Sequence, residues 1–151
     1  MNAPYVRSQD KTEEIVYKPV GFFHTRYSRA TGAPRQGALK PEKRGTIEIL
    51  PMYQDALTKL ESNEYIIVLY HLDKVNGWSS FVKPGGISSN EESGLFATRS
   101  PRRPNPIGFG VIRLYKIEKG KLYISGMDAF DGTPVLDIKP FIPALDCPSV
   151  E

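Results

Sequence analysis

The sequence has 151 residues, of which 40% are hydrophobic and 25% are charged, with a formal net charge of +3. This length and composition suit one globular domain with a single core. The single cysteine, Cys147, excludes an internal disulfide and a cysteine-rich metal site, and two histidines are too few for a usual zinc site. No apolar run reaches the length of a membrane span, and the N-terminus lacks a signal-peptide core. We therefore expect a cytoplasmic protein that needs neither a membrane nor a metal.

Glycine, proline and aromatic residues are abundant, with 13 glycines, 13 prolines, 8 tyrosines and 7 phenylalanines. This composition favours short strands joined by many turns. From the N-terminus we expect a flexible extension over residues 1–13, a strand interrupted by proline and glycine over 15–25, a long basic loop over 28–44 and an alternating strand over 45–50. Residues 51–60 are the best candidate for a helix, because Pro51 suits a first helical turn and Met52, Ala56 and Leu60 recur on one face.

The second half of the chain contains further strand patterns. Residues 64–72 form a nearly continuous apolar run that predicts a central buried strand. The segments that follow the next loop are a strand over 110–118, a hairpin turn at 119–120, a strand over 122–127, a turn over 131–134 and an extended segment over 135–141. No helix separates successive strands, which argues against a parallel nucleotide-binding sheet. We expect a mainly β fold, a single-domain antiparallel β-barrel with one short helix, over residues 14–151.

One segment combines rigidity with positive charge: residues 97–108 (ATRSPRRPNPIG), here named the arginine loop. Arg99, Arg102 and Arg103 lie within five residues of one another and are separated and followed by prolines. Proline fixes φ and removes a backbone donor, so the segment is predicted to be a stiff loop rather than a helix interior or a central strand. Guanidinium groups held at fixed separations suit a carboxylate, a phosphate or a stacked base. The alternative is a surface turn whose charges only keep the protein soluble.

Three other clusters carry candidate chemistry. The turn at residues 33–37 (APRQG) presents an arginine and an amide, although such residues also occur on ordinary loops. Residues 70–73 (YHLD) end the predicted buried strand, where a histidine is more often a structural residue than a base. Within residues 125–140, Asp128 and Asp137 lie in apolar surroundings and need polar partners. Motifs of dinucleotide, phosphate-loop and nucleophile-elbow enzymes are missing, so an enzyme of this sequence is expected to transfer a group by positioning two bound molecules.

Two long motifs and one short motif resemble a known family. The runs FATRSPRRPNPIG (residues 96–108) and DGTPVLDIKPF (131–141), preceded by APRQ (33–36), are similar to the TrmO (TsaA-like, YaeB-type) proteins. The resemblance extends from about Val16 to Pro143. It implies an S-adenosylmethionine-dependent tRNA methyltransferase that methylates the exocyclic N6 of threonylcarbamoyl-adenosine next to the anticodon. It also implies a single-domain β-barrel that is usually a homodimer, with the methyl-donor site near the subunit contact.

The resemblance further implies which residues form the site. S-adenosylmethionine is expected to contact Arg35, Gln36, Gly37, Ala38, Leu39, His71, Leu72, Arg99, Phe109, Ser125, Gly126, Met127 and Asp128. The tRNA nucleotide is expected to face Arg102, Arg103, Asn105 and Lys139, with Lys83 and Arg26 as further candidates for phosphate contacts. The target nitrogen is poorly nucleophilic and must lose a proton as it is methylated. Asp137 is the first candidate to accept that proton, with Asp128 second.

Two features depart from the family pattern. Many members carry an aromatic residue where this chain has Arg102, and many carry a C-terminal extension that helps to hold tRNA, whereas this chain ends at Glu151. Binding of tRNA is therefore expected to depend on the basic loops or on a second subunit. Two alternatives stay open: a methyltransferase of the same fold that acts on another RNA or a small molecule, and a non-enzymatic RNA-binding barrel that stacks bases on aromatic and arginine side chains.

Overall fold

The computed structural model describes residues 14–83 and 91–149. The predicted N-terminal extension, residues 1–13, lies outside the described residues, as does part of the polar tract that precedes the arginine loop. Within the described ranges, no helix is long and apolar enough to cross a membrane.

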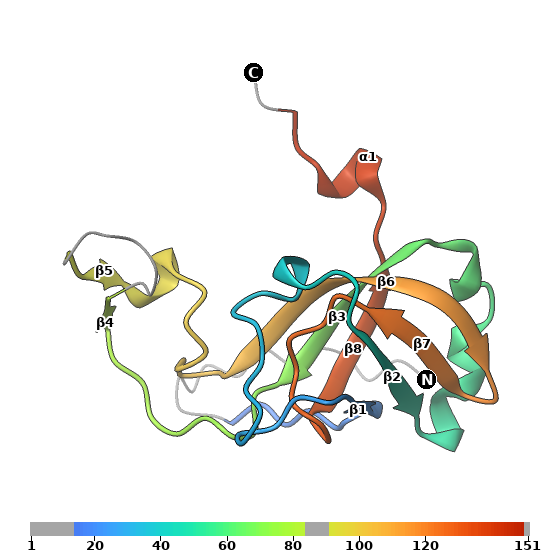
Figure 1. Cartoon of the computed structure of the whole chain (residues 1–151), viewed down its shortest axis with the longest axis horizontal. Helices are drawn as coiled ribbons and strands as arrows, with labels where there is room; N and C mark the ends of the chain where they lie inside the picture. The colour runs from blue at the N-terminus through green and yellow to red at the C-terminus, as the bar shows by residue number, and fades with distance from the viewer. Residues whose placement is uncertain (1–13, 84–90, 150–151) are drawn as a thin grey trace.

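Six antiparallel strands close into a barrel in the order β1-β2-β7-β6-β3-β8 (Figure 1). Their bounds are β1 Gly21–His24, β2 Arg44–Ile49, β3 Tyr65–His71, β6 Ile107–Glu118, β7 Lys121–Ser125 and β8 Pro134–Pro140. The first strand completes the barrel, because β1 pairs with β2 on one side and with β8 on the other. Closure removes the unpaired edges that an open sheet would expose. The predicted fold class, a mainly β antiparallel barrel, is confirmed.

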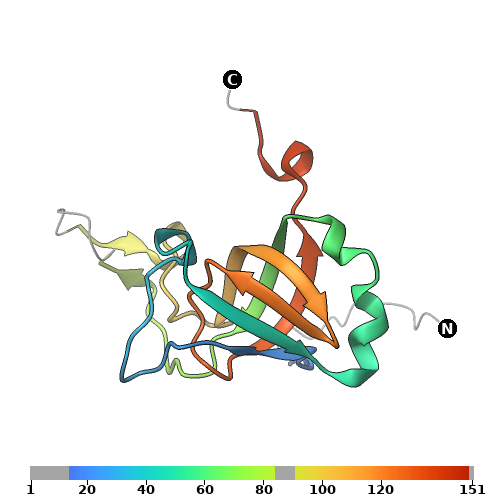
Figure 2. The same cartoon turned by 45° about the vertical axis from the view of Figure 1, so that its right-hand side comes forward.

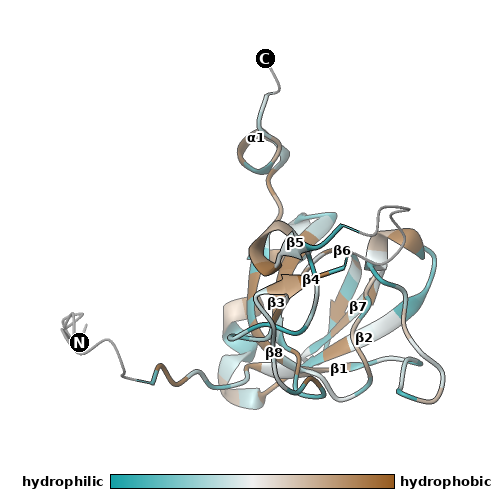
Figure 3. Ribbon diagram, turned by 90° about the vertical axis from the view of Figure 1, so that its left-hand side faces the viewer, coloured by the Kyte–Doolittle hydropathy of each residue, from teal (hydrophilic) through white to brown (hydrophobic). Residues whose placement is uncertain are grey.

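The core fills the barrel interior, because alternate residues of each strand point inward. In β3 the inward residues Ile66, Val68 and Tyr70 are buried, whereas the outward residues between them are half-buried. The predicted strand over 64–72 is therefore present, but it is buried mainly on one face. Figure 2 shows β2, β7 and β6 side by side around this interior, and Figure 3 shows hydrophobic and hydrophilic residues interspersed along the strands. This packed interior fixes the positions of the loops at the barrel ends.

Helical segments are short and lie outside the barrel wall. The predicted helix over 51–60 is instead two 3-10 helices, η2 (Pro51–Leu57) and η3 (Leu60–Ser62). Between them Lys59 has a φ of 70°, which interrupts the helical backbone. Of the predicted apolar face, Met52 is 77% exposed and Ala56 is also exposed, so that prediction is wrong for both and holds only for Leu60. The side chains that do pack against the core are those of Tyr53, Leu57 and Leu60.

Other elements differ from the sequence prediction at their bounds. Strand β1 begins at Gly21 rather than near Ile15, and Ile15, Val16 and Tyr17 are exposed. Strand β6 begins at Ile107, where it pairs with His71, so the last two residues of the arginine loop belong to the barrel. The remaining elements are η1 (Gly37–Leu39), η4 (Leu95–Ala97), a two-stranded ribbon of β4 (Phe81–Val82) and β5 (Ser93–Gly94), and the helix α1 (Pro143–Asp146). The ribbon and α1 both project from the barrel in Figure 1.

Candidate functional site

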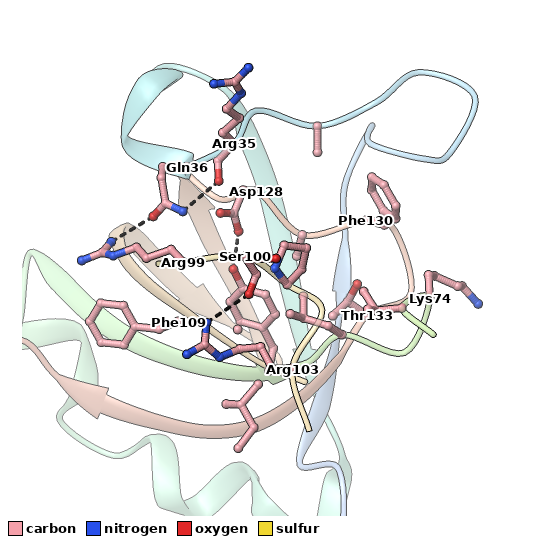
Figure 4. Close-up of a pocket in the computed structure, with 18 of the residues that line it drawn as sticks. Arg35, Gln36, Lys74, Arg99, Ser100, Arg103, Phe109, Asp128, Phe130 and Thr133 are labelled. Atoms are coloured by element: carbon pink, nitrogen blue, oxygen red, sulfur yellow. Dashed lines mark hydrogen bonds between the residues drawn. The ribbon is translucent and has the colours of Figure 1, made fainter. Parts of the chain in front are cut away.

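A cavity of about 930 Å³ opens at one end of the barrel (Figure 4). Its lining comes from the turn at 33–36, the end of β3 with the loop that follows, β4, the arginine loop, the start of β6 and the loop between β7 and β8. These segments are far apart in the sequence, and each of the three predicted clusters contributes to them. The closed barrel brings them together because β3, β6, β7 and β8 all begin or end at this side.

A chain of hydrogen bonds joins two of the rigid loops at the cavity. Nη1 of Arg99 donates to Oε1 of Gln36 at 2.9 Å, and Nε2 of Gln36 donates to the carbonyl oxygen of Arg35 at 2.8 Å (Figure 4). The side chain of Arg99 is exposed, so the bridge contributes little to folding stability. Its effect is positional: it holds a cation beside the cavity, where an anionic group of a ligand can reach it.

Asp128 is a half-buried carboxylate in the cavity wall, and the hydroxyl of Tyr70 donates a hydrogen bond to its Oδ1. Burial raises the pKa of Asp128, while the Tyr70 hydroxyl and the backbone N–H groups of Asp128 and Gly37 oppose the rise by stabilising the carboxylate. Tyr70 is only 3% exposed. Its burial and the neighbouring Asp128 charge strongly raise the pKa of Tyr70, so the phenol keeps its proton and remains the donor.

Two close backbone approaches make this arrangement possible. A Cβ atom at Gly108 would lie 2.1 Å from Cε2 of Tyr70, so only glycine leaves room for the ring that carries the hydroxyl. A Cβ atom at Gly37 would lie 1.9 Å from the carbonyl oxygen of Gly126, which has a φ of +79°. Gly37 and Gly126, both predicted to contact the methyl donor, therefore let two loops touch and form the wall behind Asp128.

Arg103 folds the arginine loop back on itself. Its Nη1 donates to the carbonyl oxygens of Thr98 at 3.0 Å and of Ser100 at 3.1 Å. The guanidinium carbon also lies 5.6 Å from the ring centroid of Phe96. Arg103 thus shapes the loop through backbone contacts, in addition to lining the cavity.

The predicted site residues fall into two groups by position. Those that line the cavity are Arg35, Gln36, Leu72, Lys83, Arg99, Arg103, Phe109 and Asp128. Those that do not line it are Arg26, Gly37, Ala38, Leu39, His71, Arg102, Asn105, Ser125, Gly126, Met127, Asp137 and Lys139. Ser125 and Met127 are buried, and the Ser125 Oγ lies 3.0 Å from the Tyr115 hydroxyl, so both support the wall from behind.

Asp137, the first candidate for the proton acceptor, lies away from this cavity. Its Oδ2 accepts from Nζ of Lys139 at 2.8 Å, and this ion pair raises the pKa of Lys139. Asp137 instead lines a second hollow of about 360 Å³, together with Tyr53, Leu57 and Ile138. Asp128 is thus the member of the predicted pair that faces the larger cavity.

Several lining residues were given no role from the sequence, although all but Lys74 lie in segments that it pointed to: Tyr70, Asp73, Lys74, Thr98, Ser100 and Phe130. Asp73 is a second carboxylate of the cavity, and its Oδ2 lies 3.5 Å from Nζ of Lys74. All six adjoin a predicted residue along the chain or lie within two positions of one. In the sequence, these six residues are marked only by lying near a predicted site residue. Such proximity does not indicate which side chains point into the cavity.

A closed barrel with a loop-lined cavity, a half-buried carboxylate and clustered arginines defines a small ligand-binding β-barrel domain. Residues 22–147 match the family described as the tRNA-methyltransferase O N-terminal domain. Because the match spans more than half of the chain, the protein belongs to this family. The family predicted from the motifs is confirmed.

Individual relatives point the same way. The chain is 41% identical over 133 residues to an S-adenosyl-L-methionine-binding protein of Archaeoglobus fulgidus, covering 88% of this chain and 94% of that protein. It is 35% identical over 144 residues to the human tRNA (adenine(37)-N6)-methyltransferase, covering 91% of this chain but 32% of the relative. A crystal structure of TrmO from Pseudomonas aeruginosa superposes with a TM-score of 0.73 at 36% identity, covering 91% of this chain and 60% of that one. These names agree with the predicted enzyme class, a methyltransferase, and with the predicted cofactor.

Proposed function

We propose that this protein is an S-adenosylmethionine-dependent tRNA methyltransferase that acts on N6 of the adenosine next to the anticodon. Its substrate in this proposal is the threonylcarbamoylated form of that adenosine, and its place of action is the cytoplasm. The observation that carries the proposal is the meeting of the family's motif segments at one cavity that holds both a half-buried carboxylate and arginine side chains. The names of the relatives support a tRNA substrate.

The residues of the cavity fit the cofactor. Its volume of about 930 Å³ lies within the range of small-molecule sites, about 300–1,000 Å³. Leu72, Phe109 and Phe130 offer apolar surface for an adenine ring, and Arg99 offers a cation for the amino-acid carboxylate. When bound, S-adenosylmethionine supplies an electrophilic methyl group on its sulfonium. The chain's own task is to hold the target nitrogen in line with that group and to exclude water.

Asp128, predicted both to contact the donor and to act in catalysis, suits proton acceptance. Burial raises the pKa of this carboxyl, which makes the carboxylate a stronger base. In the proposed step a nitrogen–carbon bond forms, the sulfur–carbon bond breaks, and the proton that leaves the nitrogen passes to Asp128. Tyr70 donates to the same carboxylate and so keeps its position fixed.

We propose that the RNA substrate binds to the arginine loop. Arg103 lines the cavity, and Arg102 and Asn105 of the same loop are exposed, so cationic and amide donors are available there to an RNA. Lys83, which directly follows β4, adds a cation to the lining. Such groups bind phosphates without reading sequence and make the affinity depend on salt.

The proposal also includes a homodimer, formed through the outer face of β6. Ile107, Phe109 and Val111 point outward there and are 44%, 46% and 36% exposed. Ile107 and Phe109 also line the cavity, so in the proposed dimer the donor site lies beside the subunit contact. Leu39 on η1, which contacts β6, is 64% exposed. Sedimentation should show a dimer that Val111→Lys converts to monomers, because a charge would be buried in the interface. A monomeric wild-type protein would contradict this part.

The central experiment supplies methyl-labelled S-adenosylmethionine with three RNAs: tRNA carrying threonylcarbamoyl-adenosine, the same tRNA without that modification, and unfractionated RNA. Label is expected on the modified adenosine, and Asp128→Asn should reduce methyl transfer far more than it weakens donor binding. Donor binding without label on that tRNA would refute the substrate. Label on another RNA would favour a different methyltransferase, and no donor binding would favour an RNA-binding barrel.

A further inference from the structure

Phe96 is held in a fixed position although its side chain is 82% exposed. It belongs to η4, whose first residue, Leu95, is 3% exposed and anchors the turn in the protein. The backbone N–H and the hydroxyl of Thr98 both donate to the carbonyl oxygen of Leu95, at 3.0 and 2.8 Å. The N–H of Leu95 donates to the carbonyl oxygen of Ser80 at 2.9 Å, which ties η4 to the segment before β4.

Arg103 supports the phenylalanine ring from within the arginine loop. Its guanidinium carbon lies 5.6 Å from the ring centroid, and its Nη1 donates to two carbonyl oxygens of the same loop. The guanidinium group is therefore fixed at both the ring and the backbone. An aromatic ring that is prepared in this way loses little conformational freedom when a second flat group binds to it.

Phe96 also lies next to the cavity in a cationic setting. Thr98 and Arg103, which contact its turn and its ring, both line the cavity. Arg99 and Arg102 belong to the same loop as Arg103, while the exposed Glu91 and Glu92 precede β5. A lone exposed phenylalanine needs no explanation on a protein surface. A phenylalanine that is anchored through its turn, contacted by Arg103 and followed in the sequence by a loop with two further arginines has the charge and shape that complement an unpaired nucleotide.

We infer that Phe96, backed by Arg103, is a stacking site for an unpaired base of the RNA substrate adjacent to the target adenosine. The inference rests on the proposed tRNA substrate and adds how the loop of that RNA is held. Unpaired bases are recognised by stacking on aromatic and guanidinium planes, and every base can stack in this way. The site therefore contributes affinity and position rather than sequence preference.

The test compares single substitutions in the full chain. The probe is an anticodon stem-loop with threonylcarbamoyl-adenosine, carrying 2-aminopurine at a neighbouring loop position. Phe96→Ala is expected to weaken binding of this RNA about tenfold, and to relieve the quenching of the 2-aminopurine. Phe96→Trp should restore both, whereas Phe96→Leu, which keeps apolar bulk without an aromatic ring, should not. Calorimetry should find S-adenosylmethionine binding unchanged in all three. Tyr17→Ala is the matched control, because Tyr17 is 69% exposed and does not line the cavity.

Each outcome supports or overturns the inference. Equal RNA affinity for Phe96→Ala and Tyr17→Ala, or full function in Phe96→Leu, overturns it. A change from dimer to monomer in Phe96→Ala assigns the ring to a second copy of the chain and also overturns it. Wild-type protein that binds the stem-loop and quenches the probe without methylating it refutes the proposed function while the stacking site stands. Methylation with an unchanged KM in Phe96→Ala refutes the stacking site alone.

Discussion

Replacing Tyr70 with phenylalanine removes one hydroxyl group and keeps the ring that packs over Gly108. The lost group is a donor to the half-buried carboxylate of Asp128. A hydrogen bond to a charged partner contributes about 1.5–3 kcal/mol, and one between neutral groups about 1 kcal/mol. We therefore expect the free energy of unfolding to fall by about 1.5–3 kcal/mol at pH values above the folded-state pKa of Asp128, and by about 1 kcal/mol at pH values below it, where the carboxyl is protonated.

The direction of the pH effect follows from the pKa of Asp128, which burial raises above its ordinary value. Asp128 therefore has a higher pKa in the folded protein than in the unfolded chain. Its contribution to stability is complete at pH values below the unfolded-state pKa, and it is lost as the pH rises through the folded-state pKa. The Tyr70 hydroxyl lowers the pKa of Asp128, so its removal raises that pKa further. The deficit of Tyr70→Phe relative to the wild type should therefore grow with rising pH. For the same reason, the acid limb of methyl transfer should move to higher pH.

Two assays check this prediction. Denaturant unfolding at pH 4 and pH 8 measures the stability deficit, and initial rates at saturating S-adenosylmethionine measure the acid limb of the pH profile. A variant that is destabilised equally at both pH values, with an unmoved acid limb, would show that the hydroxyl has only a packing role. That result would refute the reasoning that links Tyr70 to the ionisation of Asp128.

Three further predictions follow from the site. Gly108→Ala should lower the free energy of unfolding by about 1–3 kcal/mol in a denaturant titration, because its Cβ would meet the Tyr70 ring; unchanged stability would contradict the close approach. Arg99→Ala should weaken S-adenosylmethionine binding by about tenfold or more in calorimetry, and Gln36→Ala, which removes the bridge and a neutral amide but no charge, should weaken it less; equal losses would contradict a direct contact between Arg99 and the carboxylate. Asp137→Asn should leave the methyl-transfer rate within about twofold of the wild type, because a carboxylate outside the cavity removes none of the charge-assisted hydrogen bonds within it; a large loss would restore Asp137 as the proton acceptor.

The fold was largely predictable because its information is local. Period-2 alternation, β-branched runs and turn residues predicted most of the barrel strands. The ends of the strands were less predictable. Residues 15–20 continue the strand pattern of β1 toward the N-terminus, but β1 pairs with β2 only from Gly21 onward. The segment after Pro51 shows the same limit: its pattern suits an α-helix, yet contact with the barrel holds it as a 3-10 helix with Tyr53 rather than Met52 inward.

The side chains available for the site could also be predicted from the sequence. Arg99 lies in a motif that resembles the TrmO proteins, and Asp128 lies in the cluster within residues 125–140. Which of these groups share a cavity is a property of strand order and register. Asp128 and Asp137 are nine residues apart in similar apolar surroundings, yet β8 carries one of them away from the cavity that the other faces. The cluster at residues 70–73 was marked for its histidine rather than for Tyr70, because the role of Tyr70 depends on a glycine 38 positions later that leaves room for its ring. The sequence by itself determined the barrel, the family and the available side chains. Closure of the barrel decided which of them meet, because contacts between distant segments depend on pairings that no local pattern encodes.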